Sequence, residues 1–163
     1  MPTAAAIIAQ RLALAGCRHA FGVPGGEVLT LIDALAGAGI TFHLTRHENA
    51  AGFMAEGTWQ ATGAPGILVA TLGPGVTNGL TAVANALQER VPLIVLTGRI
   101  GAGAEQGFTH QIIDHGAVMG PLVKASFTAA AGTVDLCIDK ALAIATDGQP
   151  GPVHIDLPLT LAA

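Results

Sequence analysis

Short apolar runs alternate with amphipathic segments along the whole chain, and glycine or proline separates most of them. Runs of strand length cover residues 19–23, 40–44, 67–72, 92–98, 122–127 and 152–158. Apolar positions at helical spacing predict helices over residues 3–15, 27–35, 49–61 and 134–146, and another from the turn at Gly73 to about Arg90. This alternation predicts an α/β fold of three layers, with a mostly parallel six-stranded sheet and helices on both faces.

The run over residues 67–72 is the clearest strand, because an unbroken apolar sequence is typical of a strand buried on both faces of a parallel sheet. Residues 40–44 also have the length and β-branched content of a buried strand. Glycine-rich turns follow three of the strands, at Pro24, Gly73 and Gly98. Parallel strands end at one edge of a sheet, where ligands gather, so we expect these turns to border a binding site.

Two segments after the fourth predicted strand carry weaker patterns. Glycine and alanine dominate residues 101–107, which we expect to form a mobile loop. We expect residues 110–115 to lie in or beside a short helix.

Composition changes the picture mainly because charged residues are scarce. The chain has 163 residues, enough for one domain with a core, and its apolar content of 51% excludes disorder. Only 11% of the residues are charged, so we expect a partner to cover part of the exterior. The net charge of −4 provides no basic face, which argues against nucleic acid as that partner.

No segment suggests export, a membrane or a disulfide framework. No apolar stretch reaches the ~18 uninterrupted residues of a spanning helix, and the N-terminal run carries only Arg11. Cys17 and Cys137 lie far apart without a Cys-x-x-Cys pair, which favours two small buried side chains over a zinc site or a disulfide. We therefore expect a cytoplasmic protein that does not bind membranes.

A charged cluster begins at Arg46 and passes through His47 and Glu48 into an alanine-rich helical pattern that reaches Gly57. Charges are sparse in this chain, so the cluster is a candidate site. A carboxylate in the first turn of a helix is also favoured by the helix macrodipole alone. On the residues themselves, a functional Glu48 and a merely helix-stabilising Glu48 are equally well supported.

The turn formed by Gly73, Pro74 and Gly75, with Asn78 shortly after it, could cradle a phosphate at a helix N-terminus. Its spacing matches neither a P-loop, which needs Gly-Lys-Ser/Thr, nor the dinucleotide fingerprint, which needs a third glycine. On spacing alone, an ordinary turn between a strand and a helix is the favoured interpretation.

The histidines and the single serine give little support to metal or hydrolase chemistry. The local histidine pairs, 43 with 47 and 110 with 115, lack the glutamate of a zinc protease helix, so we expect no metal site. Ser126 is the only serine and lies in a predicted strand without a nucleophile elbow. A serine hydrolase is therefore disfavoured.

Taken together, the motifs resemble the N-terminal, pyrimidine-binding domain of thiamin-diphosphate enzymes of the acetolactate synthase and 2-keto acid decarboxylase type. The matching stretches occur in family order and at family spacing over nearly all of the chain: residues 21–26, 46–57, 61–63, 73–78, 91–94 and 151–158. Each stretch is modest by itself, and the set is highly specific. The turn at Gly25 and Gly26 looks most like that of the acetolactate synthases.

The resemblance implies a role for Glu48, which matches the glutamate that hydrogen-bonds N1′ of the cofactor's aminopyrimidine and so activates thiamin diphosphate. Gln111 matches a polar residue near the reacting centre, and we take both as catalytic. The usual Phe-Gln-Glu is His110, Gln111 and Ile112 here, which leaves the substrate open among 2-keto acids. The implied cofactor-binding set is Pro24, Gly25, Gly26, Glu48, Gly73, Pro74, Gly75 and Asn78.

Relatives in this family bind the diphosphate and Mg²⁺ in a second domain, which carries Gly-Asp-Gly followed by Asn-Asn. Residues 1–163 contain neither motif. We therefore expect one pyrimidine-binding domain, either a split-enzyme subunit or an excised domain, that is inactive alone. A diphosphate-binding domain or subunit would complete it in a homo- or hetero-oligomer such as a dimer. The alternative is a catalytically inactive assembly or regulatory module of the same fold.

Overall fold

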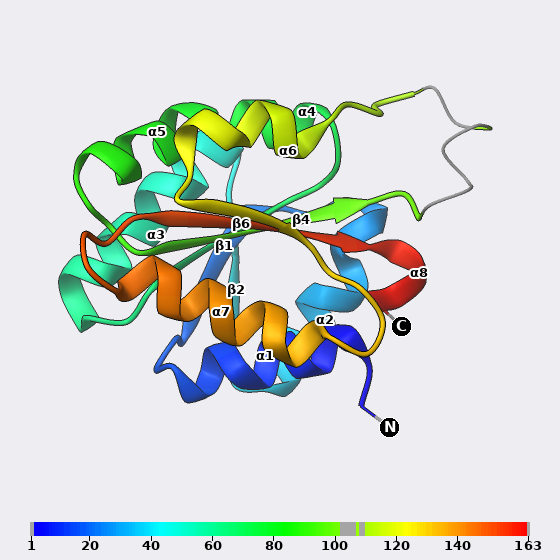
Figure 1. Ribbon diagram of the computed structural model, residues 1–163, viewed down its shortest axis with the longest axis horizontal. Coiled ribbons are helices and arrows are strands. Elements are labelled where there is room, and N and C mark those ends of the chain that lie inside the picture. The colour runs from blue at the N-terminus through cyan, green and yellow to red at the C-terminus, as the bar shows by residue number, and fades with distance from the viewer. Residues whose placement is uncertain (1, 102–106, 108–109, 163) are drawn as a thin grey trace.

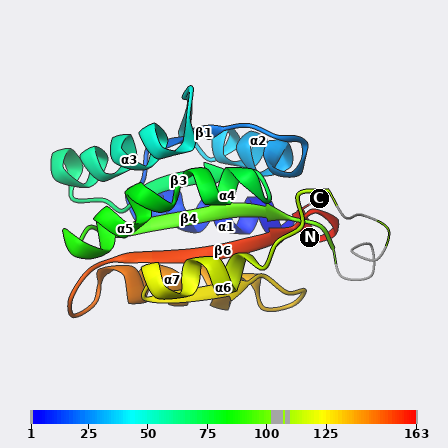
Figure 2. The same cartoon turned by 90° about the horizontal axis from the view of Figure 1, so that it is seen from above.

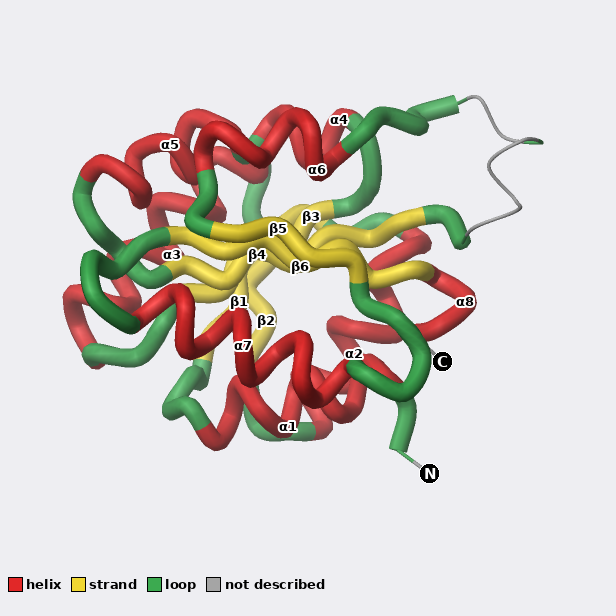
Figure 3. The backbone as a smooth tube through the Cα atoms, in the orientation of Figure 1, coloured by secondary structure: helices red, strands yellow, loops and turns green. Residues whose placement is uncertain are grey.

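A six-stranded parallel sheet lies at the centre of the computed structural model, which describes residues 2–101, 107 and 110–162. The strand order is β2-β1-β3-β4-β6-β5, and each neighbouring pair is parallel (Figure 3). The strands are β1 (His19–Val23), β2 (Thr41–Leu44), β3 (Gly66–Ala70), β4 (Leu93–Arg99), β5 (Ala125–Thr128) and β6 (Pro152–Pro158). The predicted six-stranded α/β fold is confirmed, and the sheet is wholly parallel.

Helices cover both faces of the sheet, as Figures 1 and 2 show. One face carries α1 (Ala4–Leu14), α2 (Leu29–Gly37), α7 (Val134–Thr146) and the short α8 (Leu159–Ala162). The other face carries α3 (Glu48–Thr62), α4 (Pro74–Asn78), α5 (Leu80–Gln88) and α6 (His115–Met119). Short 3-10 helices span Gly26–Val28 and Gly120–Leu122. Among the described residues, no helix is both long and apolar enough to cross a membrane.

The hydrophobic core has two halves, one on each side of the sheet, and β3 contributes to both. All five residues of β3 are buried, as its unbroken apolar run predicts. Ile67 and Val69 pack toward α1, α2 and α7, whereas Leu68 packs toward α3 and α5. Successive side chains of a strand point to opposite faces, so a strand covered on both sides must be apolar throughout.

The strand over residues 40–44 is not the buried strand that its composition predicts. It forms β2 at the edge of the sheet, pairs only with β1, and leaves Leu44 71% exposed. Aromatic and β-branched residues favour strands at the edge as well as at the centre, so composition could not separate the two.

Two other elements differ in their bounds from the prediction. The helix expected up to about Arg90 is divided at Gly79 into α4 and α5, and it ends at Gln88. The fifth strand begins at Ala125, because Pro121 lies in a 3-10 turn just before it.

The expected mobile loop over residues 101–107 lies largely outside the described residues. Cys17 is buried as predicted, whereas Cys137 is only half-buried.

Helix α3 lies unusually close to its neighbours because two glycines remove side chains from the contact. A Cβ on Gly52 would overlap the Cβ of Ala82 on α5, and a Cβ on Gly66 would overlap the backbone of Ala55. Gly57, one and a half turns further along α3, is exposed and has open space around it. The same residue type therefore serves packing at Gly52 and has no packing role at Gly57.

Replacing Gly52 and Gly57 by alanine should have opposite effects on stability. Gly57→Ala should raise the free energy of unfolding by about 0.5–1 kcal/mol, because alanine is the better helix former. Gly52→Ala should lower it by about 1–3 kcal/mol, because the added methyl group forces α3 away from α5. Urea denaturation of both variants measures the difference, and equal effects at the two positions would contradict the packing described for α3.

Candidate functional site

The turns after β1 and β3 meet at the carboxyl edge of the sheet, where Gly98, which was predicted to form a third turn, is instead a residue of β4. The chain leaves β1 toward β2 on one side, while β3 lies on the other, so the turns border the point where strand order reverses. Such reversal points leave a crevice for ligands. A Cβ on Gly25 would overlap the hydroxyl group of Thr71, and a Cβ on Gly98 would stand 2.6 Å from the Cβ of Glu27. The turns are therefore in direct contact, as the sequence predicts.

Thr71 joins two of these turns. Its hydroxyl group donates a hydrogen bond to Glu27 Oε2 at 2.6 Å and lies against Gly25. On the other side, its methyl group lies 2.8 Å from where a Cβ on Gly75 would stand. Neither Thr71 nor Glu27 is among the predicted site residues. Thr71 lies near the end of the predicted strand over residues 67–72, and Glu27 directly follows the glycine turn.

Glu48 is the first residue of α3 and is 6% exposed. The imidazole of His47 caps this helix by accepting a hydrogen bond from the backbone N–H of Asn49 at 3.1 Å. The side-chain amide of Asn78 donates to Glu48 Oε2 at 3.0 Å. The other oxygen, Oε1, lies 3.5 Å from the position of a Cβ on Gly75. The structure thus brings Glu48, Gly75 and Asn78 together, and Glu48 is also well placed to interact with the helix macrodipole.

The turn after β3 is shaped so that Asn78 reaches Glu48. Gly73 has φ 60° and ψ −109°, a backbone conformation that favours glycine, and Pro74 occupies the first position of α4. Helix α4 has five residues and ends at Asn78. A carboxylate beside Gly75 would repel a phosphate at the same place. The geometry therefore gives no support to a phosphate cradle here.

Gln111 reaches the same turn from a distant part of the chain. Its backbone has φ 63° and packs directly on Gly73, leaving no room for a side chain there. Gln111 also borders a cavity of about 290 Å³, together with Leu72, Arg99 and His115. Gln111 and Glu48 therefore lie at opposite ends of one turn, which spans residues 73–75.

Pro24 and Gly26 complete the predicted set. Both are exposed, whereas Gly25 between them is half-buried against Thr71. Within the described part of the chain, neither Pro24 nor Gly26 is found in contact with Glu48.

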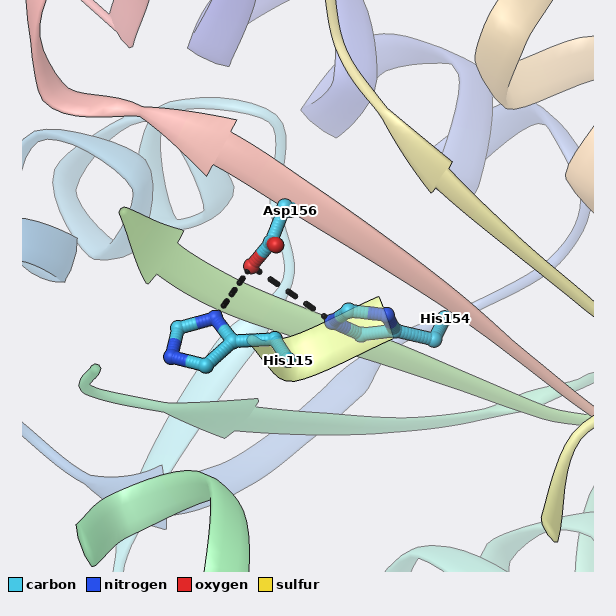
Figure 4. Close-up of side chains that lie close together, drawn as sticks. All are labelled: His115, His154 and Asp156. Atoms are coloured by element: carbon cyan, nitrogen blue, oxygen red, sulfur yellow. Dashed lines mark hydrogen bonds and ion pairs between the residues drawn. The ribbon is translucent and has the colours of Figure 1, made fainter. Parts of the chain in front are cut away.

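A buried hydrogen-bond network lies beside the turn, and sequence reasoning missed it. His115, His154 and Asp156 point toward one another (Figure 4). Asp156 Oδ1 lies 2.7 Å from His115 Nδ1 and 2.5 Å from the hydroxyl group of Thr97, and its Oδ2 lies 3.7 Å from Arg99. Burial opposes ionisation of Asp156, but the hydrogen bonds from His115, His154 and Thr97 outweigh it and hold its pKa well below the usual range.

Hydrogen-bond directions fix the protons of this network. The backbone N–H of Gly73 donates to His115 Nε2 at 3.1 Å, so the ring proton of His115 must be on Nδ1, facing Asp156. The hydroxyl group of Thr97 donates to Asp156, so it accepts from His154 Nε2 at 2.7 Å. This assignment leaves His154 Nδ1 to accept from Ser126, 2.8 Å away.

The same assignment bears on metal binding. One atom from each of His115, His154 and Asp156 lies within 4.8 Å of the others, a spacing that could hold a metal ion. A metal on His115 Nδ1 would place the ring proton on Nε2, against the N–H of Gly73. The hydroxyl group of Thr97 also lies between His154 and Asp156. The arrangement is thus a complete hydrogen-bond network rather than an open set of ligands.

Comparisons with known proteins identify the family of the chain. Residues 2–118 match the family model described as thiamine pyrophosphate enzyme, N-terminal TPP binding domain. The chain is 37% identical to the acetolactate synthase large subunit of Buchnera aphidicola subsp. Acyrthosiphon pisum (strain APS), over 94% of this chain and 27% of that protein. It is 39% identical to the acetolactate synthase isozyme 3 large subunit of Escherichia coli (strain K12), over 97% of this chain and 28% of that protein.

A third relative has a different name. The probable 2-ketoarginine decarboxylase AruI of Pseudomonas aeruginosa (strain PAO1) is 37% identical over 99% of this chain and 30% of its own length. The chain therefore spans less than a third of each of these relatives. The family model covers most of the chain: the chain belongs to the family of N-terminal, thiamin-diphosphate-binding domains of thiamin-diphosphate enzymes.

Proposed function

We propose that this chain is the pyrimidine-binding half of a thiamin-diphosphate enzyme acting on 2-keto acids, in which Glu48 activates the cofactor through N1′ of its aminopyrimidine. The observation that carries the proposal is the buried Glu48 carboxylate, held at one oxygen by Asn78 with the other oxygen beside Gly75. A carboxylate in this arrangement can share a proton with a ring nitrogen that approaches over the glycine.

The residues present fit a flat heterocycle. Gly25 and Gly75 lack side chains on either side of Thr71, and a Cβ on Gly75 would stand 3.5 Å from Glu48 Oε1. Asn78 holds Glu48 Oε2, which would leave Oε1, beside Gly75, to meet a bound ring nitrogen. When bound, thiamin diphosphate supplies a thiazolium carbon that stabilises the carbanion left when a 2-keto acid loses carbon dioxide. In this proposal the chain contributes the proton-holding carboxylate, and Gln111 lies near the reacting centre.

A second domain completes the proposed site. It would bind the diphosphate and Mg²⁺, because Gly-Asp-Gly and Asn-Asn do not occur in this chain. Leu44, Phe53 and Met54 are 71%, 43% and 47% exposed, and they flank Glu48 along the chain. Large apolar side chains exposed around a site are typical of a covered surface. The partner therefore packs over the N-terminal half of α3. In this proposal the assembly is a homo- or hetero-oligomer in the cytoplasm.

Carboligation and simple decarboxylation both start from a 2-keto acid, and the proposed role of Glu48 serves either reaction. Glu27 adds a second carboxylate at the turns, with its Oε2 bound to Thr71. A 2-keto acid with a cationic side chain would suit this charge, and one relative is named for 2-ketoarginine. In the alternative, an inactive assembly module, Glu48 would have structural roles only, at the start of α3 and in the bond to Asn78.

Glu48→Gln should reduce turnover by about 100-fold or more in an assembly of this chain with a diphosphate-binding domain, the scale for a positioned proton-transfer group. Glutamine keeps the size of the side chain and an acceptor for Asn78, but it cannot hold the shared proton. Steady-state assays of 2-keto acid consumption measure the change. The matched control is Glu56→Gln on the same helix, which should keep near-normal turnover because Glu56 is bound to Asn85, away from the turns.

Near-normal turnover in Glu48→Gln would reject the assigned role. Equal losses in the Glu48 and Glu56 variants would point to damage to α3 rather than to lost proton transfer. Absence of turnover in the wild-type assembly, with the cofactor bound, would favour the inactive module.

Cofactor affinity should depend on the partner. The chain alone should bind thiamin diphosphate weakly or undetectably by calorimetry, with or without Mg²⁺, because it offers the diphosphate no ligand set of the family type. Addition of a diphosphate-binding domain should restore tight binding. Tight, Mg²⁺-dependent binding by the chain alone would contradict the need for a second domain.

A further inference from the structure

We infer that His115 is a positioning residue, whose neutral ring, held by Asp156, accepts the Gly73 amide and so fixes the turn beside Glu48. The hydrogen bonds that carry this inference join three separate parts of the fold: α6, the end of β6 and the turn after β3. Its relevance to catalysis rests on the proposed function, whereas the bonds themselves can be tested without a cofactor.

The hydrogen bond between His115 and Gly73 is buried, and Gly73 has a backbone conformation that favours glycine. His115 is 3% exposed and Gly73 is buried. The φ and ψ of Gly73 take its N–H out of the local helical pattern, and His115 Nε2 supplies the acceptor at 3.1 Å. Asp114 fixes the start of α6 by accepting from the N–H of Ala117 at 2.9 Å, which orients the helix that carries His115. The amide is therefore bound to a side chain that is itself held in place.

The effect of this bond reaches Glu48 through α4. Gly73 is the N-cap of α4, and the N–H of Thr77 donates to the carbonyl oxygen of Gly73. The same short helix contains Gly75, which lies beside Glu48 Oε1, and ends at Asn78, which donates to Glu48 Oε2. A displacement of Gly73 therefore moves both groups that set the surroundings of the carboxylate.

The bond requires a neutral His115. A second ring proton would place the N–H at Nε2 against the N–H of Gly73, two donors facing each other. Asp156 on β6 faces Nδ1 of the ring, and Arg99 on β4 is bound to Asp156. His154, also on β6, meets the ring edge-on at 6.4 Å between ring centres, and Asp114 precedes His115 on its own element. The proton on Nδ1 and the free lone pair on Nε2 are therefore both used, and the bond to Gly73 exists only in this tautomer.

The first test is nitrogen-15 NMR of the wild-type chain. At neutral pH, the ring of His115 should show a protonated Nδ1 and an unprotonated Nε2, and the amide of Gly73 should be protected from hydrogen exchange. A ring protonated at Nε2 at neutral pH, or rapid exchange of the Gly73 amide, would overturn the inference.

Two variants separate the bonds of the ring. His115→Gln places an amide oxygen near the former Nε2 and keeps an acceptor for Gly73, whereas His115→Asn places an amide N–H near the former Nδ1 and keeps the donor for Asp156. Exchange of the Gly73 amide should accelerate about tenfold or more in the asparagine variant and much less in the glutamine variant.

Equal exchange rates of the Gly73 amide in both variants would contradict the inference. The remaining amide signals report whether each variant is folded, and the wild-type measurement decides the question if either is not. These measurements involve no cofactor. A failed Glu48→Gln prediction therefore leaves them standing, and their failure leaves the role of Glu48 untouched.

Discussion

A buried carboxylate needs a hydrogen-bond donor, and Glu48 obtains one from Asn78 across the boundary between α3 and α4. This bond is possible only because α4 begins where it does. Gly73 turns the chain sharply after β3, and Gly75 lets the short helix approach both Thr71 and the carboxylate. The parallel sheet fixes where β1 and β3 end, so the site depends on strand order and on glycines, with Glu48 delivered by the connection from the edge strand β2.

The buried acidic residues Glu56 and Asp156 differ in their hydrogen-bond donors and in the direction in which their pKa is shifted. Glu56 lies eight residues after Glu48 on α3 and also accepts from an asparagine, Asn85 on α5, so both pairs tie α3 to the neighbouring helices on the same face of the sheet. Burial raises the pKa of Glu56, opposed by Asn85 and reinforced by the charge of Glu89. Its Oε1 has no hydrogen-bond partner among the described residues. Asp156, with three side-chain donors around it, has a lowered pKa. The carboxylate with more hydrogen-bond donors is thus the one whose pKa is lowered.

The sequence predicted what depends on local pattern and on the edge of a parallel sheet. The buried run of β3 and the turns at Pro24 and Gly73 follow from these rules, whereas Gly98 lies in β4 rather than in a turn. The grouping of Glu48 with Gly75 and Asn78 was implied by the family resemblance alone. Edge or centre position of β2 could not be predicted, because it depends on strand order. The pairing of His115 with Asp156 joins positions 41 residues apart and follows no spacing rule. Thr71 was missed because threonine in a strand is ordinary until its neighbours are known.

The central claim is that Glu48 shares a proton with N1′ of the bound aminopyrimidine. The most direct measurement uses thiamin diphosphate labelled with nitrogen-15 at N1′, bound to an assembly of this chain with a diphosphate-binding domain. The account predicts that the N1′ signal is that of a protonated or strongly hydrogen-bonded nitrogen at neutral pH, and that Glu48→Gln returns it to the value of the free, unprotonated ring. An N1′ signal that is the same in the wild-type and Glu48→Gln assemblies, with the cofactor bound in both, would contradict it.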